Sequence, residues 1–589
     1  MDEQILLCSL LAVLVFLFIW GRLRYDAVAL LMLAVFLVLG FVSPQQAFSG
    51  LGHPAVITVI LVLLISKGLE KSGLIGWIGI RLENIVHSQM QFQILICLTA
   101  AVLSSFMNNI GAMAMLLPIA LGISKKMEWN PSAILMPLAF ASILGGMNTK
   151  IGTPPNIIIS EMRAEYSGLG FNFFDFSYLG FPLTFFGIIL ITFLSYKILS
   201  KRNNKENYKP LIDLDEYLME MKIEEGSPLL EKRVRDLREE LDTDTVLMGY
   251  VNEEGKKSEM HGNQKFINNQ ILVLKVNPDY LSDLQQKYKL KVHVEKSEND
   301  TLEAFGSLEA IILPSSKLIS RKYNYFKRLI GENFSLLGLW RSGSKFRFRL
   351  SNETFRSGDV LLLANRGEEN KIGEKLEVMG LVPLWKRELD IKKNSSKAFL
   401  ALMIFLLSLS TVIFDIFPVI IAFLICVLAY VSTKLLSSEG IYRHIDWPVV
   451  VLLAAMIPIG NTINDYGIAN LIAKYLAAYS LDLNLIWILI LLMVITMFLS
   501  DIINNAATVI IMSPIAYNLA IELGKPIDAF LMTVAVGASC AFLTPIGHQC
   551  NTLVMGPGNY KFGDYWKLGL PLEILIVAVS IPLIIFFWT

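Results

Sequence analysis

The chain has few charged residues and few cysteines for its length, and both shortages exclude classes of protein. Only 17% of its 589 residues are Asp, Glu, Lys or Arg, and the formal net charge is +0. This balance gives no reason to expect a nucleic-acid partner, which would be attracted by a basic surface. The five cysteines lie in apolar segments or at the edge of one, so we expect free thiols and no disulfide framework.

The sequence also lacks the signatures of enzymes and of potassium channels. No spacing of side chains suggests a nucleophile with its base or a set of metal ligands, so we do not expect an enzyme. No GxGxxG motif follows a strand-like run in the polar middle of the chain, which leaves a nucleotide-binding fold unsupported. No TVGYG-like selectivity filter is present, which argues against a potassium channel.

Long apolar runs are abundant instead. Hydrophobic residues make up 54% of the chain, and many runs approach the roughly 20 residues that cross a bilayer as a helix. The runs form two blocks, 4–199 and 398–588, on either side of a polar stretch. We therefore predict a multi-pass α-helical protein of the cell (inner or plasma) membrane, in contact with lipid. The first run, 4–20, has an acidic start and no small-residue cleavage site, which predicts a retained helix.

The first block predicts five crossings and one hairpin. The expected spans are 4–20, 27–42, 54–70, 132–162 and 178–198, with an interfacial helix at 76–89. The segment 91–123 is interrupted by Asn108-Asn109, and we interpret it as a re-entrant hairpin because one helix of this length would extend about 50 Å. The span 132–162 contains GGMNTKIGTPPN, whose glycines and prolines predict a helix that is broken between 146 and 155.

The second block predicts the same order of elements. Its expected spans are 398–413, 417–434, 449–463 and 570–588, with a helix-rich surface stretch at 464–483, a hairpin at 485–520 and a broken span at 529–556. A shared motif links the blocks, since SSFMNNIGAMAMLLP at 104–118 returns as SDIINNAATVIIMSP at 500–514, a constant 396 residues later. Five crossings are an odd number, so the second half enters from the opposite face. This predicts an inverted repeat whose hairpin tips meet near the midplane.

The charges of the short loops predict the orientation. With both termini outside, the cytoplasmic loops are rich in Lys and Arg, as the positive-inside rule requires. They contain Arg22, Arg24, Lys67, Lys71, Arg81, Lys125, Lys126, Lys434, Arg443, Lys561 and Lys567, whereas the outside loops contain Arg163, Lys474 and Lys525.

The polar stretch 201–396 predicts a cytoplasmic insert between two membrane domains, 1–200 and 397–589. It is rich in Lys, Glu, Asp and Asn, and it contains strand-like runs such as NQILVLKV. The segment KFINNQILVL (265–274) is matched by TFRSGDVLLL (354–363) at an offset of 89. We infer two small α/β modules, at about 210–290 and 300–385.

Paired amides at membrane depth predict a polar site. A buried Asn brings donors and acceptors that lipid cannot satisfy, and broken helices offer free backbone groups for ions. Such residues can also simply hold helices together, but their duplication at one spacing favours a site. The candidates are Ser104, Asn108, Asn109, Gly152 and Thr153 in the first half and Ser500, Asn504, Asn505, Thr544, Gly547 and His548 in the second. Ser104 and Ser500 stand one helical turn before Asn108 and Asn504, so each hydroxyl is expected to face its tip.

Four segments carry a resemblance to a known family. SILGGMNTKIGTPPN, FMNNIGAMAMLLP, INNAATVIIMSP and TPIGHQCNTLVMGPGNYKFGDYWKLGLPL resemble the divalent anion:sodium symporter family, within the wider ion transporter superfamily. The resemblance covers essentially the whole chain. It is closest to the sulfate or SLT-type permease branch, whose insert holds two TrkA-C (RCK-C) modules. It implies elevator-type alternating access, a homodimer, and modules that sense a small regulatory ligand.

The resemblance also implies two sodium sites, with an anion between them. Carried over by position, the first sodium site uses Ser104, Asn108, Asn109 and Gly152, and the second uses Ser500, Asn504, Asn505 and Gly547 with Thr544 nearby. The anion would meet Asn109, Thr153, Asn505 and His548.

Three departures from the family pattern bear on the substrate. Dicarboxylate-transporting relatives carry Ser-Asn-Thr at each tip, whereas this chain has Ile110 and Ala506 in place of the two threonines, which favours sulfate. His548 stands where the first half has Thr153; it can donate to an oxyanion, make activity pH-dependent, or simply pack. Lys150 falls in the first break, where an ammonium is costly; it can bind the anion, replace a cation, or only reach water.

The sequence therefore predicts a secondary active transporter that moves a small divalent oxyanion, sulfate above all, with sodium. A carrier of a di- or tricarboxylate or another anion, which could be coupled to protons, is the alternative within transport. An RCK-gated channel subunit is the alternative from another class. Asp501, beside the second tip, is the nearest acid and could serve coupling or pair with a cation.

Overall fold

We analysed a computed structural model of the whole chain. It describes residues 2–20, 23–127, 129–198, 217–241, 245–251, 257–258, 260–276, 281–292, 306–313, 316–330, 334–341, 354–365, 376, 379–383, 395–437, 441–480 and 484–589. The predicted junctions between the insert and the membrane blocks, and parts of both predicted modules, lie outside these residues.

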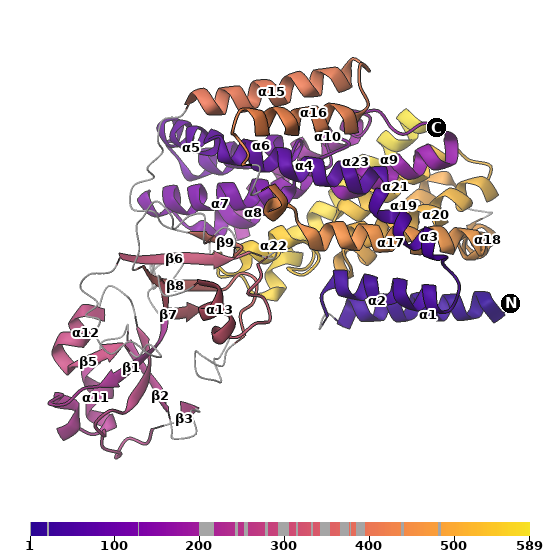
Figure 1. The fold of residues 1–589 in the computed structure, drawn as a ribbon. Coiled ribbons are helices and arrows are strands. Elements are labelled where there is room, and N and C mark those ends of the chain that lie inside the picture. The colour runs from indigo at the N-terminus through magenta and orange to yellow at the C-terminus, as the bar shows by residue number, and fades with distance from the viewer. Residues whose placement is uncertain are drawn as a thin grey trace.

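The first block is a set of packed helices (Figure 1). They are α1 (Asp2–Trp20), α2 (Tyr25–Val38), α3 (Pro44–Ser49), α4 (Pro54–Lys71), α5 (Leu74–Ile85), α6 (Gln89–Ser104), α7 (Asn109–Lys126), α8 (Pro131–Gly146), α9 (Pro154–Ser167) and α10 (Ser177–Ile198), with a 3-10 turn, η1, at Gly50–Gly52. Both interruptions expected from the sequence are present, since the chain leaves the helix between α6 and α7 and between α8 and α9.

The second block repeats this order of helices. It contains α15 (Ser395–Ile413), α16 (Val419–Ser432), α17 (Trp447–Asp465), α18 (Ile468–Ser480), α19 (Leu485–Ile502), α20 (Asn505–Glu522), α21 (Ile527–Ser539), α22 (Gln549–Met555) and α23 (Tyr565–Trp588), with 3-10 turns η9 (Ile441–His444) and η10 (Phe562–Asp564). Two spans are shorter than predicted. Helix α2 stops before Gly40, whose φ is +79°, and α16 begins only after Pro418 and ends before Lys434, whose φ is +58°.

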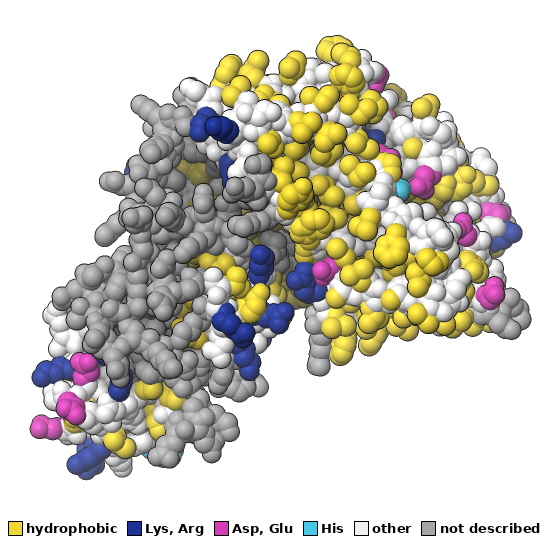
Figure 2. All heavy atoms as spheres, in the orientation of Figure 1, with side chains coloured by type: hydrophobic (Ala, Val, Ile, Leu, Met, Phe, Trp, Pro, Cys, Tyr) yellow, Lys and Arg dark blue, Asp and Glu magenta, His cyan; other side chains and the backbone are white. Residues whose placement is uncertain are grey.

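The outer surface of the helix block is apolar. Among the described residues, seven helical stretches are long and apolar enough to cross a membrane, and further apolar helices have 10–17 residues. Large hydrophobic side chains are exposed along several of them, such as Phe16 on α1, Phe181 on α10, Leu407 on α15 and Phe586 on α23. Figure 2 shows hydrophobic side chains spread over the helix block, whereas charged side chains are prominent on the insert. A surface of this kind is stable against lipid but not against water.

The insert folds around one sheet with two hydrophobic cores. Its strands are β1 (Tyr217–Ile223), β2 (Thr245–Val251), β3 (Lys257–Ser258), β4 (Ile271–Val276), β5 (Leu290–Val292), β6 (Gly306–Ile312), β7 (Phe334–Trp340), β8 (Val360–Asn365) and β9 (Leu381–Pro383). The helices are α11 (Val234–Glu240), α12 (Leu281–Tyr288) and α13 (Tyr323–Ile330), with a 3-10 turn, η3, at Pro228–Glu231.

The strand order in the sheet is β3-β2-β4-β1-β7-β8-β6-β9, and β5 pairs with β1. One buried cluster lies among residues 219–290 together with Leu362 of β8, and another lies among residues 310–381. Among the described residues, the strands of the two repeats pair with each other where Leu218 of β1 lies beside Leu339 of β7. The two sequence repeats therefore form two parts of one sheet, with one buried cluster of side chains mainly in each part.

Candidate functional site

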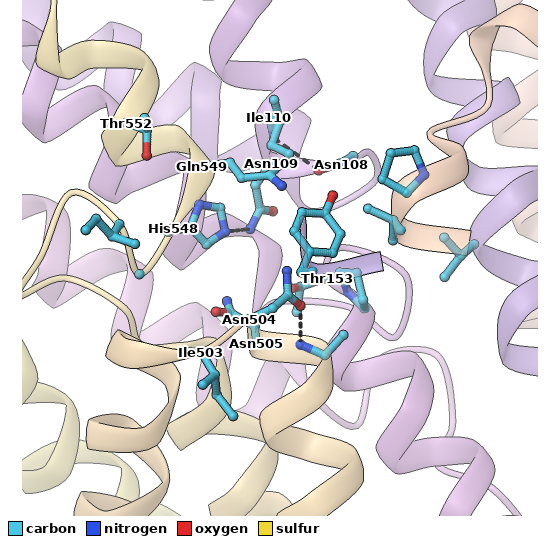
Figure 3. A pocket seen from close by; sticks show the side chains of 18 of the residues that line it. Asn108, Asn109, Ile110, Thr153, Ile503, Asn504, Asn505, His548, Gln549 and Thr552 are labelled. Carbon is cyan, nitrogen blue, oxygen red and sulfur yellow. Dashed lines mark hydrogen bonds between the residues drawn. The ribbon is translucent and has the colours of Figure 1, made fainter. Parts of the chain in front are cut away.

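A cavity of about 470 Å³ lies where the two halves of the helix block meet. We call Ser104–Asn109 the first tip, Ser500–Asn505 the second tip, 147–153 the first break and 540–548 the second break. All four segments contribute to the wall of the cavity, through Asn108, Asn109, Ile151, Gly152, Thr153, Ile502, Ile503, Asn504, Asn505, Ile546, Gly547 and His548. Figure 3 shows these elements around one space.

The two asparagines of the first tip have different structural roles. The Asn108 Oδ1 accepts from the Ile110 backbone N–H at 3.1 Å, which caps the start of α7. The Asn109 Oδ1 accepts from the Ser104 hydroxyl at 2.7 Å, so its amide NH₂ group is turned toward the cavity. The Ser142 hydroxyl donates to the Asn109 backbone oxygen at 2.8 Å and fixes the tip against α8.

The second tip repeats this arrangement. The Asn504 Oδ1 accepts from the Ala506 N–H at 2.9 Å, and the Asn505 Oδ1 accepts from the Ser500 hydroxyl at 3.0 Å. The Ser500 hydroxyl also lies 2.6 Å from the Ala538 carbonyl oxygen. The sequence placed each serine one turn from the first asparagine. The structure pairs it instead with the second asparagine, because the tip reverses between them.

Each break is held open by a buried asparagine that donates to the unwound backbone. The Asn156 Nδ2 bonds the Thr149 carbonyl at 2.9 Å, and the Asn551 Nδ2 bonds the Thr544 carbonyl at 3.1 Å. The sequence did not predict a role for either asparagine. Their role follows from the free carbonyls that any interrupted helix leaves behind.

Glycine is required in the first break because the backbone segments touch. A side chain at Gly152 would place its Cβ 2.4 Å from the Gly146 carbonyl oxygen. A Cβ on Gly146 would in turn lie 2.3 Å from the Asn109 Oδ1. The first tip and the first break are therefore packed without space for any larger residue.

The helices that follow these segments begin at the cavity. Helices α7, α9 and α20 start at Asn109, Pro154 and Asn505, and the residues at all three starts line the wall. Free backbone N–H groups and the positive ends of the helix dipoles thus converge on the same space. A small anion is the ligand that this arrangement suits.

Two side-chain donors face each other in the cavity wall, and the described part of the chain offers neither of them an acceptor. The His548 Nδ1 accepts from the Cys550 N–H at 3.1 Å, so the neutral ring carries its proton on Nε2. That Nε2 lies 3.4 Å from the Asn109 Nδ2, which is also a donor because the Asn109 Oδ1 is bonded to Ser104. Figure 3 shows the ring and the amide pointing toward one another. An anionic oxygen would accept from both groups.

Thr153 occupies the position in the first half that His548 occupies in the second half. It adds a hydroxyl to the cavity wall. It is the N-cap of α9, and its side chain makes no capping hydrogen bond. Thr153 lines the cavity. Its hydroxyl is placed to bond a ligand rather than its own helix.

Neutral oxygen atoms gather behind each tip. The first set comprises the Ser104 and Ser142 hydroxyls with the Asn109 amide oxygen, and the second comprises the Ser500 hydroxyl, the Asn505 amide oxygen and the Ala538 carbonyl. Among the described residues, no group of three or more His, Cys, Asp and Glu side chains could hold a metal ion. Hard, uncharged oxygens fit a monovalent cation such as sodium better than a transition metal.

Several predicted residues stand behind the cavity wall. Ser104, Ser500 and Thr544 support the tips and breaks, and Thr544 does so by accepting from the Gly547 N–H at 2.9 Å. Lys150 does not reach the cavity, since its ammonium lies 3.4 Å from the Glu161 carboxylate on α9. The local ion pair offers the ammonium a partner that the sequence did not reveal.

Other wall residues were missed. They are Arg24 and Tyr25 before and in α2, Pro448 and Val449 in α17, Gln549 in α22, and Ser316, Ile319, Ser320 and Ser357 in the insert. Asp446 precedes α17 beside this region, and burial raises the pKa of its carboxyl to about 6, with Arg24 partly opposing the shift. No local motif marks these residues, because each comes from an element that only the fold brings to the cavity.

Proteins that are similar to this chain in sequence are described as transporters, the class that the sequence predicted. The chain is 28% identical over 611 residues to the uncharacterized transporter YfbS of Escherichia coli K12, covering 99% of this chain and 98% of that protein. It is 24% identical over 349 residues to sodium/sulfate cotransporter 1 of Chlamydomonas reinhardtii, covering 55% of this chain and 38% of the relative. The solved structure of the Alcanivorax borkumensis YdaH transporter matches 97% of each chain at 14% identity, with a TM-score of 0.45.

The model of one protein family matches nearly the whole chain, over residues 15–524 and 484–589. The description of that family is citrate transporter, and it lies in the ion transporter superfamily that the motifs predicted. The chain therefore belongs to the CitMHS citrate transporter family of membrane transporters.

Proposed function

We propose that this protein is a secondary active transporter that couples the uptake of sulfate, or a closely similar divalent oxyanion, to sodium. The observation that carries the proposal is the pair of donors on His548 and Asn109, which converge at 3.4 Å with no acceptor between them. A tetrahedral oxyanion presents several acceptor oxygens and would satisfy this pair together with Thr153 and the Asn505 amide.

The electrostatics of the wall favour a small anion with a companion cation. Among the described residues, Arg24 is the only Lys or Arg in the cavity wall. The Arg24 guanidinium already pairs with the Asp26 carboxylate at 3.0 Å. A dianion held only by neutral donors and helix termini would leave a large net charge in the membrane. Sodium bound at the oxygen sets behind the tips would offset that charge.

The name of one relative and the residues at the two tips support this proposal. Sodium and sulfate appear together in the name of the Chlamydomonas reinhardtii cotransporter that matches half of the chain. The positions of the two family threonines are occupied by Ile110 and Ala506, both in the cavity wall, so the tips present apolar groups there. A carboxylate substrate would lose two hydroxyl donors at these positions.

We further propose that the tips and breaks move together between the two faces of the membrane in an elevator-type cycle. The insert would lie in the cytoplasm and both termini outside, as the loop charges predict. Helices α4, α15, α16 and α17 would then form the static support, since they carry none of the tip or break residues.

Citrate or another di- or tricarboxylate is the second candidate, and the family's description favours it. The cavity volume of about 470 Å³ is also large enough for such a molecule. The two candidates differ in charge and in the number of acceptor oxygens, so a direct comparison separates them.

Purified protein in proteoliposomes would be given radiolabelled sulfate, succinate and citrate under one inward sodium gradient. We expect sulfate to be taken up fastest, and unlabelled sulfate to compete. Uptake of citrate or succinate without uptake of sulfate would reject the sulfate assignment and support the carboxylate.

A further inference from the structure

Part of the insert forms a wall of the cavity. We call the described residues between 306 and 383, which include β6, β7, β8, β9 and α13, the lid. Ser316, Ile319, Ser320 and Ser357 of the lid line the same cavity as His548 and both tips. Figure 1 shows β6 and β9 at the edge of the helix block, next to α22. The lid therefore borders the site directly, across one face of the cavity.

The lid and the helix block meet through a backbone contact between two glycines. A Cβ on Gly556, just after α22, would lie 2.2 Å from the Gly358 carbonyl oxygen. A Cβ on Gly358 would lie 3.0 Å from the Thr552 carbonyl oxygen on α22. The same Cβ on Gly556 would lie 3.5 Å from the Trp340 ring. Only glycine allows so close an approach of the two segments.

Apolar burial extends this contact. Ile311 of β6 and Val360 of β8 are both fully buried, and they belong to the same hydrophobic cluster as the membrane helices. Burying two branched side chains stabilises an interface by roughly 1.5–3 kcal/mol each. The docked lid is thus held mainly by apolar packing, which is reversible without any chemical change.

The loop that carries Gly358 is rigid. The Arg341 guanidinium bonds both oxygens of Asp359 at 2.6 Å, and it also bonds the Thr354 carbonyl at 2.7 Å. The Gly358 N–H donates to the Ile312 carbonyl at 2.9 Å. A loop fixed in this way transmits a displacement of the lid to α22 instead of absorbing it.

Helix α22 connects the lid to the anion donors. It is capped by His548 at one end and contacts Gly358 of the lid at the other, and seven helical residues extend only about 10 Å. The Ser357 hydroxyl is buried beside the cavity, and it has no hydrogen-bond partner among the described residues. Since a buried hydroxyl without a partner is unfavourable, an anion in the cavity would stabilise the docked lid.

We propose that the lid is a mobile closure of the insert side of the cavity, docked through Gly358 and Gly556, and that the cavity opens on that side only when the lid leaves α22. The docked lid holds His548 in place, and release of the lid frees α22 to move with the second tip. The proposal rests on the proposed function only for the identity of the anion.

The test uses a chemical probe that needs no transport. Cysteine placed at Ser357 is shielded while the lid is docked, so its reaction with a maleimide in detergent-purified protein measures release of the lid. Gly556→Ala adds one methyl group against the Gly358 carbonyl, and the Gly556 φ of −63° suits alanine. We expect this substitution to raise the labelling rate of S357C by about tenfold, because overpacking weakens the docked state.

Gly563→Ala is the matched control, since a Cβ there meets nothing within 4 Å. The labelling rate of S357C combined with Gly563→Ala should equal that of S357C alone. Mass spectrometry separates the label at position 357 from label at Cys8, the exposed native cysteine. If the Gly556→Ala and Gly563→Ala variants are both monodisperse and are labelled at equal rates, the proposal of a lid is wrong.

If Gly556→Ala does not fold, Trp340→Ala replaces it, because it removes a contact without adding an overlap. Added sulfate should slow the labelling of I319C, a probe at another cavity-lining position of the lid that keeps the Ser357 hydroxyl. Slower labelling with citrate but not with sulfate would leave the lid standing and reject sulfate. Labelling that is fast in the parent, and unaffected by any substitution, would reject the lid whatever the substrate.

Discussion

The His548 Nε2 and the Asn109 Nδ2 lie 3.4 Å apart although 439 residues separate them in the chain. One donor comes from the second break and the other from the first tip. Each has its remaining polar atom occupied, by Cys550 and by Ser104 respectively. We propose that this pair of donors binds an anionic oxygen; the pair comes together only when both halves of the chain fold.

Replacing His548 by asparagine should weaken anion binding selectively. An Asn side chain can still accept from the Cys550 N–H and cap α22, but it is too short to present a donor at the cavity. Losing one hydrogen bond to a charged ligand, about 1.4 kcal/mol or more, should raise the KM for sulfate about tenfold or more. The sodium dependence should keep its half-saturation point.

His53 provides the matched control. It caps α4 in the same way, with its Nδ1 accepting from the Ala55 N–H at 3.2 Å, but it lies outside the cavity wall. His53→Asn should leave the KM unchanged. A similar rise in both variants would mean that loss of helix capping, not loss of an anion donor, explains the effect.

Ser500→Ala should affect sodium more than the anion. The substitution removes a hydroxyl from the second oxygen set and leaves the Asn505 amide oxygen without its donor. We expect the sodium concentration for half-maximal uptake to rise about tenfold, as loss of roughly 1.4 kcal/mol would produce. Uptake as a function of sodium concentration measures it.

Ser513 on α20 serves as the comparison for Ser500. Its buried hydroxyl bonds the Val509 carbonyl within the helix at 2.6 Å and takes no part in either tip. Ser513→Ala should keep the normal sodium dependence. An unchanged sodium response in Ser500→Ala would remove this serine from the proposed sodium site.

Gly152→Ala should abolish most transport. Its Cβ would overlap the Gly146 carbonyl at 2.4 Å, so the first break must shift and displace the Asn109 amide packed against it. We expect uptake to fall by at least about tenfold, since overpacking of a close-packed site costs roughly 1–3 kcal/mol. Gly111→Ala on α7, where a Cβ meets nothing within 4 Å, should transport normally. Normal transport by both variants would show that the break tolerates rearrangement.

The stability of the protein should fall with rising pH because of Asp446. Burial raises the pKa of this carboxyl from its ordinary 3.8 to about 6, so the folded state binds the proton more tightly than the unfolded chain does. The stabilisation is complete below about pH 4 and is lost as the pH rises through about 6. Asp446→Asn should therefore stabilise the protein at pH 7.5, by an amount on the order of 3 kcal/mol, and should have little effect near pH 4.

Thermal unfolding across this pH range measures the effect of Asp446. Asp415 is exposed and adopts a φ of +52°, which asparagine also tolerates, so Asp415→Asn is the control. A difference in Tm between Asp446→Asn and the parent that is the same at every pH would contradict the assignment.

Much of the membrane architecture could be read from the sequence because its signals are local. Apolar runs, the amide pairs and the Gly and Pro residues in the breaks each determine their own segment, and a helix lies at each predicted span. Where helices proved shorter, as at Gly40 and Lys434, the cause is a left-handed residue whose conformation only the folded chain specifies.

The sites were predictable only in part, because their details depend on contacts between distant segments. The duplicated motif indicated the tips, but not that Ser104 and Ser500 bond the second asparagine of each pair. The sequence left Lys150 open as a ligand or a bystander, because Glu161, about two turns into α9, could not be assigned to it in advance. The approach of Gly358 to Gly556 joins two domains and leaves no pattern in either segment.

Sodium-driven accumulation of sulfate tests the central proposal most directly. Proteoliposomes with equal sulfate inside and outside, a collapsed proton gradient and a clamped membrane potential would receive an inward sodium gradient. The proposal predicts that labelled sulfate accumulates above its equilibrium level and that accumulation stops when sodium is replaced by choline. Accumulation that ignores sodium and follows an imposed proton gradient instead would contradict it.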